Sequence, residues 1–587
     1  MRPGPRGGAT ALVLLVALVG TGLAARAIGG RALTAFTTYE TPFAFPAVDT
    51  RPGPPMARQV VVVLVDGLGL AASRGMPFLD ELRARGADED CVVGLPSLSL
   101  PGRAVMMTGA WQEVNGQTTN YHPRPLRVDH VFSVARRHGL MTALTAGHNG
   151  LRLFAPAVQR PVEYAKDPET APFAVYEAAL RQQAGQSRAL LEEARGQAGF
   201  VMLELHAVDE AGHGWGAASQ EYRRAAASAD EAIRGFAAPL DLSRDTLVVT
   251  ADHGHVAPGG HGGAEPSVLH VPLVLAGAGI RAGARGACRQ VDLAPTLCAL
   301  LGLPMPASSQ GRPLLDLLEL DPARRIEVLG ATVAQRERFA DRYASRLRAL
   351  DSSMRDSGPA DAGPVPPSAT ADERSLVARL DLLDHDVEMA RQARSAVEIR
   401  GRLLPALLLI LLPPLAAAVL VRARALEGGD LWRAALAGGI GVLLYHGSLP
   451  LLRIAYSMTA INKDEWLPAF FRKDMALGVA ACAVAVLLGA ASERRFHKGA
   501  LELARSAWLV AAFFCYALVV KMALIHWRQG LFPRWRLADL YWSFGFYLDL
   551  LVVLAVGLSS PLLALPAWAA ALRRRPPGVP VAARDVV

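Results

Sequence analysis

Cysteine is scarce in this sequence, and its five cysteines are widely separated: Cys91, Cys288, Cys298, Cys482 and Cys515. No Cys-x-x-Cys pair occurs, so the pattern encodes neither a disulfide framework nor a thiolate zinc site. Charged residues are also few, 19% against 52% hydrophobic residues, which excludes an intrinsically disordered chain. Any metal ion must therefore be held by aspartate and histidine.

A strong excess of one charge is absent as well. The formal net charge is +8 over 587 residues, and many arginines flank apolar runs. Anionic lipid headgroups are the simpler partner for arginines placed in this way. We therefore expect membrane lipid and no nucleic acid among the partners, and the sequence leaves the oligomeric state open.

Long apolar runs at both ends of the chain predict an integral membrane protein. Residues 1–30 carry Arg2 and Arg6 before an apolar stretch, the pattern of a signal peptide or a signal-anchor span. Residues 401–575 contain about five runs that are long enough to cross roughly 30 Å of hydrocarbon, near 403–421, 434–452, 474–491, 507–526 and 545–571. The export signal, supported by arginine-containing loops between these runs, places the middle of the chain on the extracytoplasmic side.

The middle of the chain, residues 55–320, alternates short strand-like runs with longer helical patterns. Four apolar runs are predicted strands: 60–65, 200–205, 246–250 and 271–275. This alternation predicts an α/β domain with a mostly parallel sheet flanked by helices. Residues 321–400 then read as a helical segment, a Pro/Ser-rich linker over 351–371 and a lead-in helix before the all-α transmembrane bundle.

Two oppositely charged residues fall inside consecutive apolar runs. Lys521 and Asp549 lie a few residues from the same predicted face of the membrane. Charged groups at this depth either pair with each other or extend separately to the interface. The sequence leaves both alternatives open.

Metal-capable side chains gather after three of the predicted strands. The six residues are Asp66, Asp209, His213, Asp252, His253 and His261. Ligand sites of α/β sheets form where the strands end. Carboxylate and imidazole together suit zinc or manganese. This inventory is what two-metal hydrolysis or group transfer at phosphorus needs.

A serine stands next to this predicted site. Ser99 comes immediately before a predicted helix with Pro101 in its first turn, where backbone N–H groups point outward. Its structural role would be a helix cap, whereas its chemical role would be that of a nucleophile activated by a metal. In the second role Ser99 becomes a phospho-intermediate that water or an alcohol resolves.

Together these motifs resemble the alkaline phosphatase superfamily, in particular its type I phosphodiesterase and nucleotide pyrophosphatase branch. The resemblance covers about residues 58–316. It rests on Val-Asp-Gly-Leu at 65–68, a Ser-x-Pro run from Ser99 to Thr108-Gly109, Asp-x-x-Gly-His at 209–213, Asp-His-Gly at 252–254, Gly-His-Gly-Gly at 260–263, VPLVLAGAGI at 271–280 and VDLAPTLCALLGLP at 291–304.

The resemblance implies two divalent metal ions, with Zn²⁺ expected first and Mn²⁺ or Mg²⁺ as alternatives. The implied ligands are Asp66, Ser99, Asp252 and His253 for one ion and Asp209, His213 and His261 for the other. Asn120 matches the family asparagine that holds a non-bridging phosphate oxygen. The order of membrane and exported segments is similar to that of GPI ethanolamine phosphate transferases. This similarity implies that the protein is a phosphodiesterase or phospho-group transferase that acts on a phosphate ester such as a lipid headgroup.

Two other interpretations fit part of the pattern. Ser99 followed by Arg103 also fits the sulfatase signature, in which the serine becomes formylglycine, but sulfatases carry a second aspartate where Gly67 follows Asp66. A catalytically silent membrane scaffold or transporter would have lost ligands, and all seven are present. Four further histidines receive no ligand role: His148, His206, His255 and His270.

Overall fold

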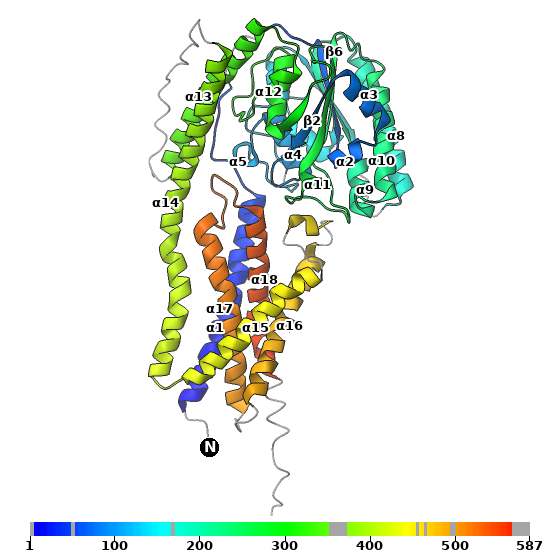
Figure 1. The fold of residues 1–587 in the computed structure, drawn as a ribbon. Coiled ribbons are helices and arrows are strands. Elements are labelled where there is room, and N and C mark those ends of the chain that lie inside the picture. Colours follow the sequence, from blue (N-terminus) through cyan, green and yellow to red (C-terminus); the bar gives the residue numbers. More distant parts are fainter. Residues whose placement is uncertain are drawn as a thin grey trace, which may run out of the picture.

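The computed structural model describes residues 5–47, 53–121, 123–165, 171–350, 372–452, 457–462, 467–493 and 500–565. The predicted linker over 351–371 and the end of the last apolar run lie outside the described residues. An α/β domain (residues 55–320) stands at one end of the molecule and a long helical bundle (α1 and α14–α18) at the other (Figure 1).

The α/β domain is built on one eight-stranded sheet. Its strands are β1 Gln59–Val65, β2 Ala87–Val92, β3 Met141–Gly147, β4 Arg160–Tyr164, β5 Gly199–Leu205, β6 Asp245–Thr250, β7 His270–Gly277 and β8 Arg285–Arg289. They lie in the order β4-β3-β5-β1-β6-β7-β2-β8. Only β7 runs antiparallel to its neighbours, so the predicted mostly parallel sheet is confirmed.

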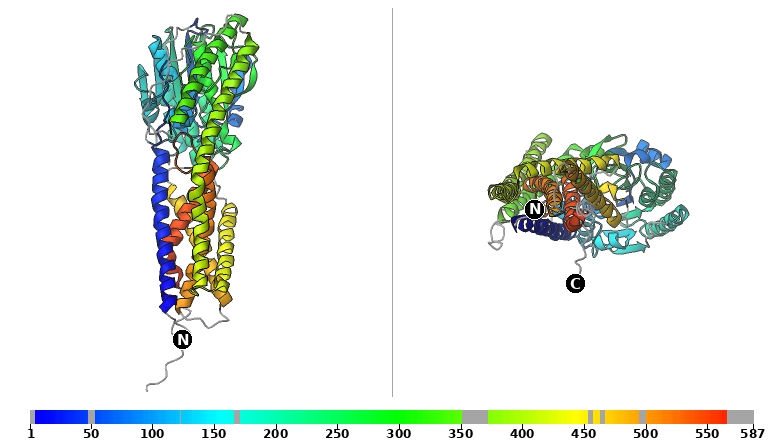
Figure 2. Two further views of the ribbon diagram at one scale, coloured as in Figure 1. Left: turned by 90° about the vertical axis from the view of Figure 1, so that its left-hand side faces the viewer. Right: turned by 90° about the horizontal axis from the view of Figure 1, so that it is seen from below.

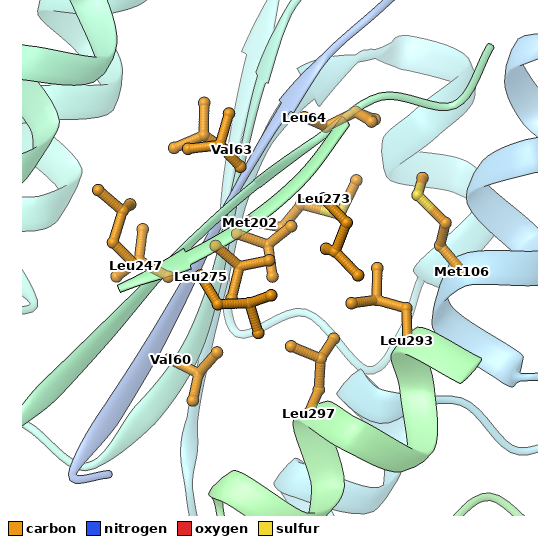
Figure 3. Close-up of a cluster of buried hydrophobic side chains, with 14 of the residues drawn as sticks. Val60, Val63, Leu64, Met106, Met202, Leu247, Leu273, Leu275, Leu293 and Leu297 are labelled. Atoms are coloured by element: carbon orange, nitrogen blue, oxygen red, sulfur yellow. The ribbon is translucent and has the colours of Figure 1, made fainter. Parts of the chain in front are cut away.

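Helices cover both faces of this sheet. They are α2 Leu70–Ser73, α3 Pro77–Arg85, α4 Ser99–Thr108, α5 Gln112–Asn115, α6 Val131–Arg137, α7 His148–Phe154, α8 Phe173–Glu193, α9 Ala207–Trp215, α10 Gln220–Ala237, α11 Pro266–Leu269 and α12 Leu293–Leu300, with single 3₁₀ turns at η1 Gln290–Asp292 and η2 Leu315–Leu317. Every residue of β1 is buried, as expected for a central parallel strand. Val60, Met202 and Leu297 belong to the resulting core (Figure 3).

Six helices of the described residues are long and apolar enough to cross a membrane. They are α1 Pro5–Thr37, α14 Glu373–Arg422, α15 Gly428–Leu451, α16 Leu467–Glu493, α17 Ala500–Gln529 and α18 Leu540–Leu563, with η3 Met458–Ala460 between α15 and α16. Large apolar side chains point out of the bundle: Leu404 is 65% exposed and Leu443 is 73% exposed. Such surfaces are stable against hydrocarbon and costly against water.

One helix belongs to both parts of the molecule. The predicted lead-in and the first predicted span form a single continuous helix, α14. Its first half packs along α13 (Pro322–Ala349), where Arg379 pairs with Glu337 at 2.8 Å, and its second half lies beside the bundle (Figures 1 and 2). The domain and the bundle are therefore joined by more than a tether.

The two charged residues predicted inside the membrane runs do meet. Lys521 Nζ of α17 lies 2.8 Å from Asp549 Oδ2 of α18, and the Asp549 side chain is fully buried. On the neighbouring helices, Tyr445 donates a hydrogen bond to Asp474 at 2.8 Å. The ion-pair alternative is confirmed, and the bundle interior contains polar contacts that link α15 to α16 and α17 to α18.

Candidate metal centre

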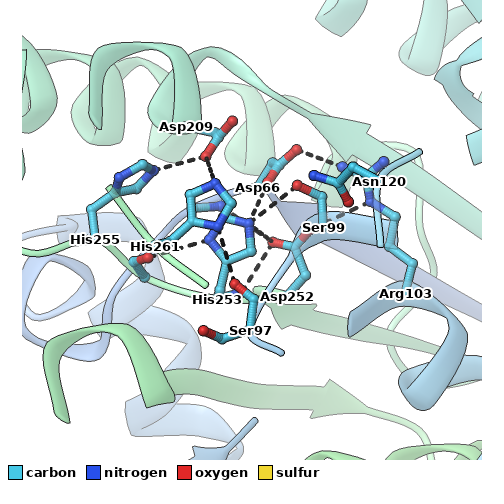
Figure 4. Close-up of polar contacts among 12 residues, drawn as sticks. Asp66, Ser97, Ser99, Arg103, Asn120, Asp209, Asp252, His253, His255 and His261 are labelled. Carbon is cyan, nitrogen blue, oxygen red and sulfur yellow. Dashed lines mark hydrogen bonds and ion pairs between the residues drawn. The ribbon is translucent and has the colours of Figure 1, made fainter. Parts of the chain in front are cut away.

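The predicted site residues converge at one edge of the sheet. Asp66 follows β1, Asp209 lies on α9 directly after β5, and Asp252 follows β6. These three strands are parallel neighbours, so their carboxyl ends meet at the same edge (Figure 4). Gly67 adopts a φ of +74°, and a Cβ there would come within 2.8 Å of Asp209 Cα. Glycine is therefore needed for the β1 and β5 loops to approach this closely.

The first half-site consists of Asp66, Asp252 and His253. One ligand atom from each lies within 4.8 Å of the others, and all three residues are buried. Asp66 Oδ1 and Asp252 Oδ2 accept no hydrogen bond from the described residues. Buried carboxylate oxygens without donors are costly unless a cation satisfies them, so this donor set fits a divalent metal ion.

The second half-site consists of Asp209, His213 and His261. His213 Nε2 lies 3.4 Å from Asp209 Oδ2 and 3.1 Å from His261 Nε2. Residues four apart on a helix share one face, which explains why Asp209 and His213 of α9 point the same way. Two imidazole nitrogens facing each other beside a carboxylate fit a second cation. His253 and His255 are also close: one ligand atom from each lies within 4.8 Å of ligand atoms of Asp209 and His261.

Hydrogen bonds at Nδ1 leave the Nε2 atom of each predicted ligand histidine available. His253 Nδ1 lies 3.2 Å from Gly254 O, His261 Nδ1 lies 3.0 Å from Ser97 O, and His213 Nδ1 lies 3.0 Å from Asn462 Oδ1. These oxygens only accept hydrogen bonds, so each Nδ1 carries the proton. This is the arrangement by which outer partners orient histidine ligands of metals.

His255, to which the sequence analysis gives no role, lies inside the site. Gly260 N donates to His255 Nδ1 at 3.2 Å, so His255 Nε2 carries the proton and donates it to Asp209 Oδ1 at 2.7 Å. His255 thus orients Asp209. Its position two residues after His253, in the same strand-end loop, is the signal that could have identified it. His148, His206 and His270 instead contact Glu163, Gln183 and Asp90, respectively.

Ser99 is the first residue of α4 and opens onto the site. Its Oγ lies 3.2 Å from His253 Nε2. Leu100 N, in the same helical turn, donates to Asn120 Oδ1 at 3.0 Å, which orients the Asn120 amide beside Ser99 (Figure 4). Ser97, two residues earlier, is buried and bonds to the backbone of Gly262 and Gly263. Of the two serines, Ser99 is thus the one whose hydroxyl faces a predicted ligand histidine.

Arg103 contributes a buried positive charge behind the first half-site. Its guanidinium lies 2.5 Å from Asp66 Oδ2, 2.9 Å from Glu204 Oε1 and 3.4 Å from Asp252 Oδ2. Tyr164 donates to Glu204 at 2.5 Å. In the sequence, Arg103 stands out only as part of a sulfatase signature, because nothing there shows that Glu204 and Asp66 lie side by side on adjacent strands.

The two half-sites differ in their electrostatics without metal. Burial raises the pKa of Asp66 and Asp252 and lowers the pKa of His253 to about 4. At His213 burial also acts to lower the pKa, but the Asp209 carboxylate outweighs it and raises the pKa to about 9. The metal-free second half-site therefore holds a proton on His213 at neutral pH, whereas His253 is neutral.

A cavity of about 500 Å³ connects the metal centre with the helical bundle. Its polar end includes Asp66, Ser99, Asn120 and His213. Its other end is lined by apolar side chains of α1, α16 and α18: Leu33, Phe36, Phe471, Phe544 and Tyr547. The site therefore opens toward helices that are apolar enough to span a membrane.

Comparison with known proteins shows a family model that this domain matches. Residues 60–258 match the family model described as type I phosphodiesterase / nucleotide pyrophosphatase. This match confirms the resemblance that the motifs carry. It covers all of the predicted site residues except His261.

More particular relatives are GPI ethanolamine phosphate transferases. The chain is 22% identical over 316 residues to GPI ethanolamine phosphate transferase 1 of Homo sapiens, covering 46% of this chain and 34% of that protein. It thus matches about a third of the length of this relative. Among solved structures, it is similar to alkaline phosphatase PafA (11% identity, TM-score 0.38, covering 46% of this chain and 100% of that one) and to a 2-O GAG sulfatase (17% identity, TM-score 0.36, covering 45% and 73%).

Proposed function

We propose that this chain is a membrane-integral, metal-dependent enzyme that cleaves or transfers a phosphate ester carried by a lipid. The observation that supports this most directly is the cavity, which has aspartates, histidines and Ser99 at one end and bundle side chains at the other. A phospholipid has the same two-part character, with a charged headgroup next to acyl chains. The class of the relatives, ethanolamine phosphate transferases, agrees with such a substrate.

Ser99 is the proposed nucleophile. Its Oγ loses its proton and attacks phosphorus, an Oγ–P bond forms, and the bond from phosphorus to the leaving oxygen breaks as that oxygen takes up a proton. Water or an acceptor alcohol then attacks the phosphoserine from the opposite side and releases Ser99. The same residues thus suit a hydrolase, in which water attacks the phosphoserine, or a transferase, in which an alcohol attacks it.

Two divalent ions, with Zn²⁺ the first candidate, are proposed to bind at the two half-sites, where they would lower the pKa of the nucleophile and neutralise charge on the phosphoryl oxygens. The proposed ligands are Asp66, Ser99, Asp252 and His253 for one and Asp209, His213 and His261 for the other. The donor chemistry of these residues supports the assignment.

Asn120 is proposed to stabilise negative charge on the phosphoryl group, and Arg103 is proposed to neutralise the carboxylates of the first half-site. Because Asn120 Oδ1 accepts from Leu100 N, its Nδ2 end is the part that can donate to a phosphoryl oxygen. Arg103 bridges Asp66 and Asp252 to Glu204 and so holds the first half-site together in the absence of substrate.

We also propose a topology. The α/β domain would lie on the extracytoplasmic side, with residues 1–30 and 401–575 in or near the membrane. The cavity then faces the outer leaflet, and a lipid would enter between α1, α16 and α18. Multiple spans exceed what anchoring needs, since one transmembrane helix suffices for that.

The test uses the full-length protein in detergent with four substrates side by side: phosphatidylethanolamine in mixed micelles, and chromogenic phosphodiester, phosphomonoester and sulfate esters. We expect phosphodiester cleavage, with the lipid preferred, and phosphate attached to Ser99 in peptide mass spectra of quenched enzyme. Ser99→Ala should retain metal and lose activity by at least about 10³-fold.

Ser97→Ala is the matched control, because it removes a hydroxyl from the same motif without touching the proposed nucleophile. In the Ser97→Ala variant, phosphate should still be found attached to Ser99. Near wild-type rates for Ser99→Ala would exclude the covalent mechanism, and cleavage of the sulfate ester alone would assign the protein to sulfatase chemistry.

A further inference from the structure

Residues 457–462, which lie between α15 and α16 in the chain, contact the second half-site. Asn462 Oδ1 lies 3.0 Å from His213 Nδ1, and Asn462 Nδ2 donates to His213 O at 2.7 Å. Asn462 is only 7% exposed. These two bonds fix the orientation of the amide, because the nitrogen must face the carbonyl and the oxygen must face the imidazole N–H.

The same segment packs closely against the glycine-rich loop that carries His261. A Cβ on Gly260 would come within 2.3 Å of Thr459 O, and a Cβ on Gly259 would come within 2.8 Å of Asn462 Nδ2. Thr459 Oγ1 accepts from Gly263 N at 3.0 Å and donates to Glu265 at 2.6 Å. The contact is therefore a specific, hydrogen-bonded interface between the bundle and the α/β domain.

The three ligand histidines differ in the source of their Nδ1 partner. His253 and His261 donate to backbone oxygens of the α/β domain, Gly254 O and Ser97 O. His213 donates to a side chain located 249 positions later in the sequence, between two membrane helices. Its partner is the only one of the three that a side-chain substitution can remove.

We infer that Asn462 is a positioning residue of the second half-site: it holds His213 with Nε2 directed at Asp209 and His261, and it thereby makes the helical bundle part of the metal centre. The inference rests on the proposed function to the extent that His213 binds a metal ion. Asn462 acts through His213, so its effect is on metal affinity first and on turnover as a consequence. Loss of such an outer partner costs about 10–100-fold in metal affinity.

The experiment measures Zn²⁺ affinity of the full-length protein in detergent by competition with a chromogenic chelator, together with the absorption spectrum of the Co²⁺-substituted protein. Asn462→Leu keeps the approximate volume and removes both hydrogen bonds. We expect the Zn²⁺ of the second half-site to lose 10–100-fold in affinity, and the Co²⁺ bands of that site to change, while the other ion is retained. Asn462→Asp keeps the acceptor oxygen and should restore binding to within about tenfold of the wild-type protein.

Thr459→Val is the control for loosening of the segment. It removes the hydroxyl that bonds to Gly263 and Glu265 but leaves the contact with His213 in place. It should lower the thermal midpoint without lowering Zn²⁺ affinity. An equal loss of affinity in Thr459→Val would overturn the specific role of Asn462, as would wild-type affinity for both ions in Asn462→Leu.

The outcomes separate this inference from the proposed function. If the wild-type protein binds two ions and turns over phosphodiesters while Asn462→Leu behaves identically, the inference alone fails. If the wild-type protein binds no ion at all, both fail together.

Discussion

The two half-sites of the candidate metal centre differ in what surrounds them. The first half-site is supported by the α/β domain, with Arg103 and Glu204 buried behind it. The second half-site lies against the bundle, where Asn462 contacts His213. The two ligand sets are similar, yet they are supported differently. The first is supported by the α/β domain itself, and the second is also supported by a residue far away in the sequence.

The largest expected effect comes from removing a ligand from either half. Asp252→Asn should empty the first half-site and His213→Ala the second, each leaving one ion per chain where the wild-type protein holds two. Because each ion stabilises charge in the transition state by several kcal/mol, turnover should fall by at least about 10³-fold in both variants. Metal content by plasma mass spectrometry and initial rates on a phosphodiester check this.

Adding Asn462→Leu to each of these two variants tests whether Asn462 acts on the second half-site alone. Combined with Asp252→Asn, it should further weaken the remaining ion. Combined with His213→Ala, it should change nothing more, since the group that it positions is gone. Additive losses in both combinations would contradict the assignment of Asn462 to the second half-site.

A change of pH should have an intermediate effect on the metal affinity of the second half-site. Because the pKa of His213 is raised to about 9, a metal ion entering the second half-site must displace a proton from it at lower pH. Affinity there should therefore rise roughly tenfold per pH unit up to about pH 9 and level off above it. His253, with a pKa lowered to about 4, releases no proton above about pH 5.

Titration calorimetry in buffers of different ionisation enthalpy measures the protons released. In the wild-type protein we expect release at pH 7.5 that disappears near pH 10. Asp252→Asn, which retains the second half-site, should keep this release. An unchanged affinity between pH 7 and 9 would mean that His213 is neutral before metal binds.

The smallest effect is expected inside the bundle. Lys521→Ala removes the ion-pair partner that lies 2.8 Å from the buried Asp549 carboxylate and should destabilise the protein by more than about 1 kcal/mol. The exchange of the two charges, Lys521→Asp with Asp549→Lys, should recover part of the thermal midpoint. Zn²⁺ affinity should not change in either variant, because neither Lys521 nor Asp549 lines the cavity that leads to the candidate metal centre. A loss of the second ion here would show that the half-site depends on the bundle in general and not on one hydrogen bond.

Much of the α/β domain could be predicted from the sequence, because local sequence patterns determine its strands and helices. The valine-rich run from Val60 to Val65 can only be a fully buried strand, and an aspartate that follows such a strand lies at the ligand-binding edge. The sequence also predicts Lys521 and Asp549 as possible partners, since helical spacing sets their depth. The roles of Arg103 and His255 could not be predicted in this way, because they depend on which strand ends become neighbours.

The sequence by itself determined which residue types follow which strands, which runs are apolar enough to span a membrane, and that aspartate and histidine must supply any metal ligands. Only the tertiary structure decided which groups face one another. Periodicity describes contacts within one element, whereas the contact of Asn462 with His213 joins groups 249 residues apart. That contact exists because Gly259 and Gly260 lack side chains and let the segment between α15 and α16 approach the metal centre.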